Sequence, residues 1–550
     1  MRRFLLPCSG VLALIGGCGL VGTYDYDNYE GPPPAESSSS SGTAGMGGMG
    51  GTAGMGGMAG MAGMPPVCPP PGGMKTPDLC NNGVDEDCSG GDCVVNAAWS
   101  ARYGDGLHQQ VEALTTTPDG GLALAGRFTG SLNVGAIPLM APNNNKLYSY
   151  VTRLDASRSA VFSKVIEETG QIEAITVQED ATFITGKFPP VVMGNGDVFL
   201  RKLNKVGSYA FMDGGWQLEW PSAATISGTA IGTTNFVGAP VFVAGRAEGI
   251  TAFPSGCAIP PNGVAPLMAN KKYGFLMSIA PTDKDCTWGN AIENATIFTL
   301  AVNNNTVVIA GIYQAALNGL PMPKPVVANS TGAFIAAYHP ATHKVQWANY
   351  FVPESPAAMA PFDYVSLLSV AVDDAGNAYA LGTFKGDFKI GNSTYTSEAN
   401  GAGSDMFVIA FDGANGGNVL WFDQFGGADV GMPPMGATQV PYSVVLAKDG
   451  LYFSGRTPAG MAIEPGKQSG PICKFTSCAF LMKLDTATGN TIWARDFGDN
   501  ETATDASFQL AADADSLWLG GGWTAKVDLG TELPPIGAQD VILARFSPLP

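Results

Sequence analysis

The sequence predicts an all-β protein, a seven-bladed β-propeller of four-stranded blades that follows a disordered N-terminal tether. Three observations support this prediction. Turn-forming residues are abundant, with 73 Gly and 39 Pro, while charged residues make up only 14% of the chain. A short apolar sequence motif that ends in a glycine recurs at long and nearly regular intervals. The last copy lacks its final strand, and a matching strand stands before the first copy.

The first 17 residues have the pattern of a secretory signal. Arg2 and Arg3 precede an apolar run that is too short to span a membrane as a mature helix. The run ends in Ile15-Gly-Gly-Cys18, which resembles a bacterial lipobox. The resemblance implies cleavage before Cys18, attachment of lipid to its sulfur, and a membrane-anchored lipoprotein outside the cytoplasm. The alternative is an ordinary signal peptide with an incidental cysteine.

Residues 18–76 contain Cys18, the expected site of lipid attachment, and a low-complexity tether rich in Gly, Met, Pro and Ser. Such a segment cannot bury enough apolar surface to offset the entropy lost on ordering, so we expect disorder. Thioether sulfur suits Cu(I), which leaves a methionine-rich copper site as the alternative. The periodic Gly-Met pattern favours the tether.

Residues 77–96 form a separate cysteine- and aspartate-rich segment. It resembles a short metal-binding motif of secreted bacterial proteins. Asp85, Asp87 and Ser89 stand at alternate positions before Gly90, and oxygen ligands at this spacing suit Ca²⁺, the one candidate cofactor. The candidate ligands carry oxygen atoms at closely spaced positions: Asp85, Asp87, Ser89 and Asp92. No glutamate ends the loop, because Asn96 stands at that position. The alternative is an acidic turn held by disulfides, without metal.

Apart from Cys8 in the signal and Cys18, eight cysteines remain, and an even number in an exported protein favours disulfides. They are Cys68, Cys80, Cys88, Cys93, Cys257, Cys286, Cys473 and Cys478. Short separations favour Cys257–Cys286 and Cys473–Cys478. The first four cysteines allow three pairings.

The repeat array occupies residues 97–550. The seven copies of the apolar motif end at Gly126, Gly186, Gly245, Gly311, Gly382, Gly455 and Gly520. Each copy has a strand before it and two after it, which makes a four-stranded unit, except that the last copy is followed by only one strand. The best copy runs from Asp374 through Tyr379 to Phe384 and ends in Trp421…Phe425-Gly-Gly. It resembles the bacterial β-propeller repeat family, which implies a propeller fold and an extracytoplasmic setting without a shared activity. The second and third copies are degenerate.

Trp99, Tyr103 and Gly104 repeat the spacing of Trp421, Phe425 and Gly426. The Trp99 strand is therefore expected to complete the last blade and to close the ring, which removes open sheet edges. An open β-solenoid is the alternative.

Few residues of the array suggest catalysis. No nucleophile elbow, zinc-protease helix or phosphate loop is present. His339 and His343 share one turn, where they are either metal ligands or surface residues. The segment from Lys483 to Trp493 resembles the tryptophan docking motif of quinoproteins, which raises a quinone-dependent dehydrogenase as an alternative. The same segment also reads as a tight turn beneath a packed indole.

The net charge of −18 and pI near 4.5 argue against nucleic-acid binding. We therefore expect a lipid-anchored, non-enzymatic binding or scaffold protein of a bacterial envelope, at the outer membrane, cell surface or periplasmic face. Its ligand is an unidentified protein or glycan. A docking subunit in envelope assembly is the alternative. Variable loops carry binding sites, and the long inserts between second and third strands are 128–147, 249–272, 385–403 and 457–477.

Overall fold

The computed structural model describes most of the array and little of what precedes it. The described residues are 78–80, 93–166, 170–187, 198–220, 226–234, 236, 238–248, 253, 257, 271–321, 326, 330–354, 363–397, 404–426, 439–458, 477–497 and 507–547. The predicted signal, Cys18 and the predicted tether lie outside these ranges. Within them, no helix has the length and apolar character needed to cross a membrane.

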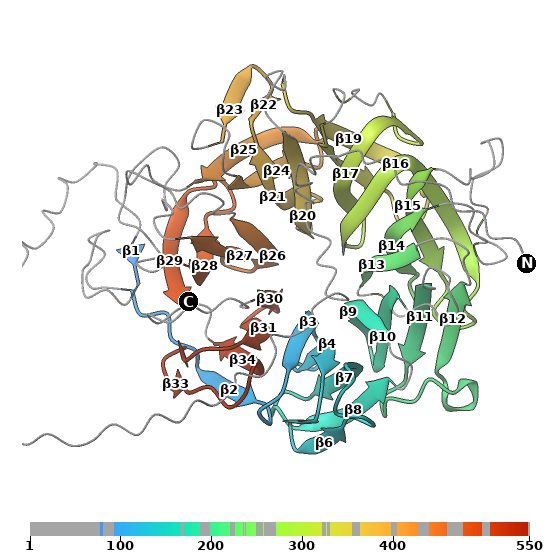
Figure 1. Cartoon of the computed structure of the whole chain (residues 1–550). Helices are drawn as coiled ribbons and strands as arrows, with labels where there is room; N and C mark the ends of the chain where they lie inside the picture. The colour runs from blue at the N-terminus through green and yellow to red at the C-terminus, as the bar shows by residue number, and fades with distance from the viewer. Residues whose placement is uncertain are drawn as a thin grey trace, which may run out of the picture. The chain divides into compact units, whose positions relative to one another are not determined.

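The described chain is built from four-stranded antiparallel units, which we number 1 to 7 in chain order (Figure 1). Unit 1 contains β3 (Gln109–Thr116), β4 (Leu122–Phe128), β7 (Tyr148–Leu154) and β8 (Ala160–Ile166). Unit 2 contains β9 (Gln171–Gln178), β10 (Ala181–Lys187), β11 (Val198–Leu203) and β12 (Trp216–Trp220).

Units 3 and 4 share one long strand, β16 (Cys286–Val302). Unit 3 contains β13 (Ile226–Thr233), β14 (Val241–Glu248), β15 (Lys272–Ile279) and the first half of β16. Unit 4 contains the second half of β16, β17 (Val307–Asn318), β18 (Gly332–Tyr338) and β19 (Val345–Phe351). The repeat pattern in the sequence predicts separate strands here. Neither Gly nor Pro is present where β16 passes from unit 3 to unit 4. The only irregularity of the backbone at this point is the positive φ of Asn294, which is 64°.

The remaining strands complete units 5 to 7. Unit 5 contains β20 (Tyr364–Val372), β21 (Ala378–Lys385), β24 (Asp405–Asp412) and β25 (Asn418–Phe425). Unit 6 contains β26 (Val440–Ala447), β27 (Gly450–Pro458), β28 (Ser477–Leu484) and β29 (Thr491–Phe497), with the short strand β1 (Asp78–Leu79) parallel to β29. Unit 7 contains β30 (Ser507–Ala512), β31 (Leu517–Trp523), β34 (Asp540–Phe546) and β2 (Trp99–Tyr103).

Buried apolar side chains fill the spaces between consecutive units. Between units 7 and 1, for example, Trp518 and Leu543 pack with Leu124 and Tyr150. The innermost strands contact one another in the order β3, β9, β13, β16, β20, β26 and β30, and β30 also contacts β3. Figure 1 shows these strands around the centre of the array. The protein therefore has an all-β, propeller-like fold.

The recurrent glycine of the second strand lies opposite a β-bulge of the innermost strand. In unit 4, Gly311 pairs with Ile297, and the ladder then skips Phe298. A Cβ atom on Gly311 would lie 2.0 Å from the carbonyl oxygen of Thr296. The same bulge occurs in every unit from 1 to 6, and the extra residues are Glu112, Glu173, Thr229, Phe298, Leu368 and Tyr442. The glycine is thus required for the close approach of two backbones.

Strand β2 forms the outer edge of unit 7. It pairs antiparallel with β34, and Trp99 lies opposite Arg545 while Tyr103 lies opposite Val541. The fourth strand of unit 7 is thus the N-terminal strand β2, as the repeated spacing of Trp99, Tyr103 and Gly104 predicts. The buried Arg102 guanidinium donates through Nε to Asp540 Oδ2 at 2.6 Å, and its Nη atoms donate to the carbonyls of Ala525 and Trp523 at 2.6 and 2.9 Å. The third predicted residue, Gly104, leaves room for the Asp540 carboxylate, which would lie 2.0 Å from a Cβ atom.

Replacement of Gly311 by Ala should lower the free energy of unfolding by at least about 2 kcal/mol, because the new methyl group meets backbone rather than a movable side chain. Gly520→Ala is the matched control. Unit 7 has no bulge, and the nearest atom to a Cβ atom there is a leucine methyl at 3.1 Å. Urea unfolding of both variants measures the difference. Equal losses of stability would contradict the role assigned to the bulge.

Replacement of Arg102 by Met should cost about 3–5 kcal/mol, because it leaves the buried Asp540 carboxylate without its cation. Lys272→Met is the control, since Lys272 forms an exposed pair with Glu248 at 3.2 Å, for which the expected loss is below about 1 kcal/mol. Thermal unfolding of the two variants tests the comparison. An Arg102→Met protein as stable as the control would show that β2 contributes little to unit 7.

Candidate functional site

The recurrent glycine and the insert between the second and third strands lie at the same end of each unit, together with the bulge in units 1 to 6. We call this end the insert end. Strand β4 ends at Phe128, two residues after Gly126, and the predicted insert 128–147 follows with the hairpin β5 (Ser131–Val134) and β6 (Ile137–Met140). The insert 385–403 likewise carries the hairpin β22 (Asp387–Ile390) and β23 (Ser393–Thr396). The inserts 249–272 and 457–477 lie almost entirely outside the described residues.

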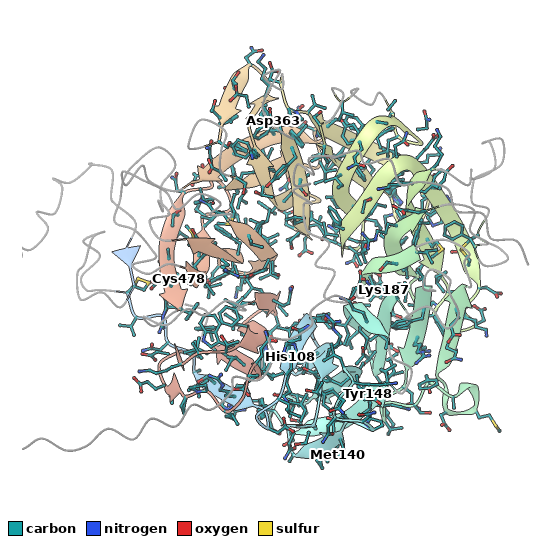
Figure 2. The ribbon with its side chains drawn as sticks, in the orientation of Figure 1. His108, Met140, Tyr148, Lys187, Asp363 and Cys478 are labelled. Atoms are coloured by element: carbon teal, nitrogen blue, oxygen red, sulfur yellow. A yellow bond between two sulfur atoms is a disulfide. The ribbon has the colours of Figure 1, made fainter. Side chains whose placement is uncertain are left out.

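Charged side chains gather at the insert end of units 1 to 3. Arg127, Lys187 and Arg246 each follow the recurrent glycine of their strand, and Glu112 and Glu173 are the bulged residues of β3 and β9. These five residues are the charged cluster. Figure 2 labels Lys187 toward the centre of the array.

The carboxylates of the charged cluster have defined partners. Arg127 Nε donates to Glu112 Oε1 at 2.6 Å, and Gln110 Nε2 donates to the same oxygen at 3.0 Å. Ser227 Oγ, on the neighbouring unit 3, donates to Glu173 Oε1 at 2.8 Å. Glu112 Oε2 is buried without a hydrogen-bond partner. The contacts of Glu112 thus lie within unit 1, whereas the Ser227–Glu173 hydrogen bond joins units 2 and 3.

Burial and charge oppose each other in this cluster. Burial raises the pKa of both the Glu112 and the Glu173 carboxyl groups, and it outweighs the opposite effects of Arg127 on Glu112 and of Ser227, Lys187 and Arg246 on Glu173. Perturbed ionisable groups gathered at one end of a fold are candidates for a binding or catalytic site. This cluster was not predicted from the sequence. Its only signal was the basic residue after four of the seven glycines.

In every unit except unit 6, the outermost strand carries an aromatic residue that packs on the turn between the third and fourth strands of the next unit; unit 7 has no such turn, because its fourth strand is the N-terminal β2. Trp421 Nε1 donates to the Thr486 carbonyl at 2.9 Å, and Trp216 Nε1 donates to the Pro281 carbonyl at 3.0 Å. The Arg158 guanidinium lies 5.1 Å from the Trp99 ring. The residue beneath the ring has a positive φ in each turn: Arg158, Gly207, Lys284, His343, Gly417 and Gly489.

This arrangement gives the two turn histidines structural roles. The His343 ring stacks on Trp288 with centroids 4.7 Å apart and an interplanar angle of 6°. Burial lowers the pKa of His343, and His339 lowers it further. His339 Nδ1 accepts hydrogen bonds from the backbone of Ala341 and Thr342 at 3.2 and 3.3 Å. The described residues contain no cluster of His, Cys, Asp or Glu that could hold a metal ion.

The quinoprotein-like segment has the same local explanation. Asp485 accepts hydrogen bonds from the backbone of Ala487 and Thr488 at 3.1 and 2.8 Å, which closes the turn. The next glycine, Gly489, lies against the Trp421 ring of unit 5. The turn therefore serves packing between units 5 and 6.

The cysteine predictions have separate outcomes. Cys257–Cys286 is disulfide-bonded as predicted, and among the first four cysteines Cys80 pairs with Cys93. Cys478 is also disulfide-bonded. Its predicted partner Cys473 lies outside the described residues, as do Cys68 and Cys88. The candidate calcium ligands Asp85, Asp87, Ser89 and Asp92 lie outside the described residues too.

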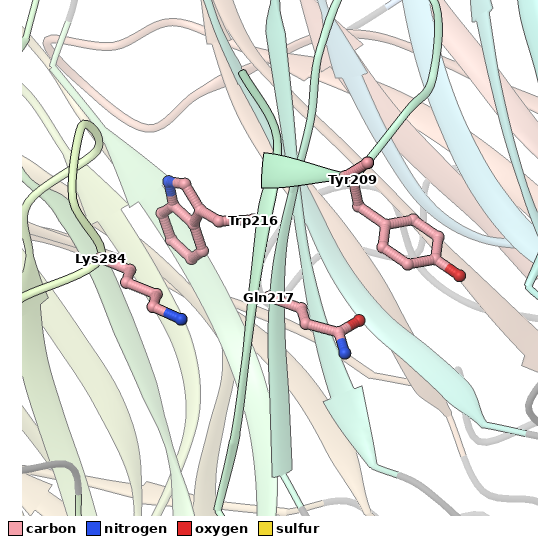
Figure 3. Close-up of a pocket in the computed structure, with 5 residues that line it drawn as sticks. Tyr209, Trp216, Gln217 and Lys284 are labelled. Carbon is pink, nitrogen blue, oxygen red and sulfur yellow. The ribbon is translucent and has the colours of Figure 1, made fainter. Parts of the chain in front are cut away.

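A pocket of about 370 Å³ lies at the end opposite the inserts, lined by Tyr209, Ala210, Trp216, Gln217 and Lys284 (Figure 3). Lys164 Nζ and Arg201 Cζ lie 4.4 and 4.9 Å from the Tyr209 ring centroid. In Figure 3, Trp216 and Lys284 lie to one side of the central strand, and Tyr209 and Gln217 lie to the other. Because the Trp216 ring is buried and its indole N–H is already bonded to Pro281, this tryptophan serves the packing of units 2 and 3.

Comparison with known proteins gives distant structural likenesses. No protein-family model matches the chain, and no curated protein matches it. The β-propeller domain of the Trilobed protease from Pyrococcus furiosus is 7% identical, with a TM-score of 0.36, over 78% of this chain and 97% of that domain. The Plexin A4 extracellular region is 8% identical, with a TM-score of 0.35, over 80% of this chain and 47% of that one. Cobalt-substituted Synechocystis ACO is 10% identical, with a TM-score of 0.33, over 82% of this chain and 94% of that one.

One carboxyl group with an altered pKa lies where an outermost strand packs on the turn of the next unit. Asn349, two residues after Trp347, donates through Nδ2 to the Gly417 carbonyl at 2.6 Å. Asp423 holds the same place after Trp421 and lies against Gly489. Its Oδ2 is buried without a partner, and burial raises the pKa of Asp423 to about 7. A protonated carboxyl group can donate a hydrogen bond here as the Asn349 amide does.

Stability should therefore fall as the pH rises from about 4 to about 7. In this range the unfolded Asp423 releases its proton while the folded one retains it. Asp423→Asn should remove this part of the pH dependence and stabilise the protein more at pH 8 than at pH 4.5. Thermal unfolding at the two pH values measures the effect.

Asp412→Asn serves as the control of opposite sign, because the Asn415 amide holds the pKa of the exposed Asp412 below its usual value. This variant should not gain stability at pH 8. If both variants respond alike to pH, the assignment to Asp423 is wrong.

Proposed function

We propose that the protein is a lipid-anchored binding scaffold of a bacterial envelope, with a closed seven-bladed propeller whose insert end binds a protein or glycan. The lipid-bearing Cys18 and the tether would hold the propeller at a membrane surface outside the cytoplasm. The seven units, the cyclic contacts of their innermost strands and the pairing of β2 with β34 support the closed ring.

One observation carries the binding assignment. The inserts, the bulged residues and the charged cluster share one end of the units, while tight turns and the packed aromatic residues occupy the other end. Loops held by a rigid scaffold are the usual place for binding sites. The proposal includes no catalytic role, and Ca²⁺ bound by Asp85, Asp87, Ser89 and Asp92 would be a structural addition to it.

Binding at the insert end can be tested with the full-length protein and two insertion variants. Gly391 and Gly238 are both turn glycines with positive φ and no neighbouring atom within 4 Å of a Cβ position. Gly391 is at the tip of the β22–β23 hairpin, and Gly238 is in the β13–β14 turn at the opposite end. Insertion of a ten-residue Gly/Ser segment after Gly391 should reduce the amount of envelope protein or glycan that cross-links to the scaffold. The same insertion after Gly238 should leave it unchanged.

Equal cross-linking by both variants would place the binding surface elsewhere. In the same experiment, Cys18→Ala should move the protein from the membrane fraction to the soluble fraction. A Cys18→Ala protein that stays with the membrane would contradict the lipid anchor. Dye-linked oxidation after addition of pyrroloquinoline quinone and Ca²⁺ would instead support the quinoprotein alternative.

A further inference from the structure

The innermost strands place one half-buried side chain per unit at equivalent positions next to the recurrent glycine. In units 1 to 6 this side chain is the bulged residue, and in unit 7 it is Gln509, which pairs directly with Gly520. We call these seven residues the central row: Glu112, Glu173, Thr229, Phe298, Leu368, Tyr442 and Gln509. All seven retain partial exposure.

The central row is divided into two chemical halves. Polar and charged residues occupy units 7, 1, 2 and 3 consecutively. Large apolar or aromatic residues occupy units 4, 5 and 6, as Phe298, Leu368 and Tyr442. Apolar side chains of this size are normally buried against other apolar groups, so three partly exposed ones in consecutive units form a surface suited to an apolar ligand.

The charged half contains two cations that have no direct partner among the described residues. Arg127 forms an ion pair with Glu112 at 2.6 Å. By contrast, Lys187 and Arg246 act on Glu173 only through their charge, and neither side chain hydrogen-bonds or ion-pairs with another described residue. The Arg246 Nε is buried and has no hydrogen-bond acceptor in the part of the chain that the structure describes. A buried donor of this kind gains free energy when an anionic acceptor reaches it.

We propose that the central row and the two cations form a binding site for an amphipathic carboxylate, a molecule with one carboxylate and one apolar portion. Lys187 and Arg246 bind the carboxylate, and Phe298, Leu368 and Tyr442 contact the apolar portion. This assignment rests on the proposed binding function of the insert end and names a ligand class for its centre.

The test measures binding of 2-naphthoate to the full-length protein by isothermal titration calorimetry. Acetate lacks the apolar portion, and 2-naphthylmethylammonium carries the opposite charge on the same rings. Both should bind at least tenfold more weakly than 2-naphthoate. The Lys187→Gln/Arg246→Gln double variant should weaken 2-naphthoate binding at least tenfold, and Phe298→Ser should weaken it about fivefold.

Lys389→Gln removes the same charge from the outer β22–β23 hairpin and should leave the affinity within about twofold. Thermal unfolding of each variant separates loss of binding from loss of fold. Tighter binding of the cation, or equal affinity of the double variant and the unchanged protein, would overturn the proposal. The insertion after Gly391 should not alter 2-naphthoate binding, so failure of the scaffold function and failure of this site give different results.

Discussion

The fold depends on the close approach of two backbones at the recurrent glycine of units 1 to 6. A Cβ atom at Gly126, Gly186 or Gly311 would lie 1.9–2.0 Å from a carbonyl oxygen of the innermost strand. This contact fixes the register of the first two strands and pushes one residue of the innermost strand out of the ladder. The same contact thus produces the sequence repeat, the end from which the inserts leave and the central row of side chains.

Much of the architecture could be predicted from the sequence because it follows from local patterns. Apolar runs between turn residues indicate the four-stranded units, and the motif that begins at Trp99 indicates the strand that completes unit 7. The continuous β16 was missed because Asn294 accommodates the crossing without Gly or Pro. The charged cluster was missed because Glu112, Arg127 and Glu173 come together only when separate repeats are placed side by side in space. The Arg102–Asp540 pair joins residues 438 positions apart and has no local signal.

The turns between third and fourth strands resemble one another because each packs against an aromatic ring of the preceding unit. The residue beneath each outer-strand aromatic ring must adopt positive φ, which glycine does without strain. Arg158, Lys284 and His343 adopt it as well, and His343 and Arg158 stack on or approach the aromatic ring that they face. A tryptophan and a tight turn at this spacing therefore identify a packing arrangement that functionally unrelated propellers can share.

The pairing of β1 with β29, together with the Cys80–Cys93 disulfide, determines how tension from the N-terminal side would enter the fold. Force arriving at Asp78 acts first on the short parallel pairing with β29. It then passes through the disulfide directly to Cys93 and along the backbone to β2. The covalent path through this disulfide bypasses the stretch of sequence between the two cysteines. The load is instead resisted in shear by the long antiparallel ladder between β2 and β34 and by the buried Arg102.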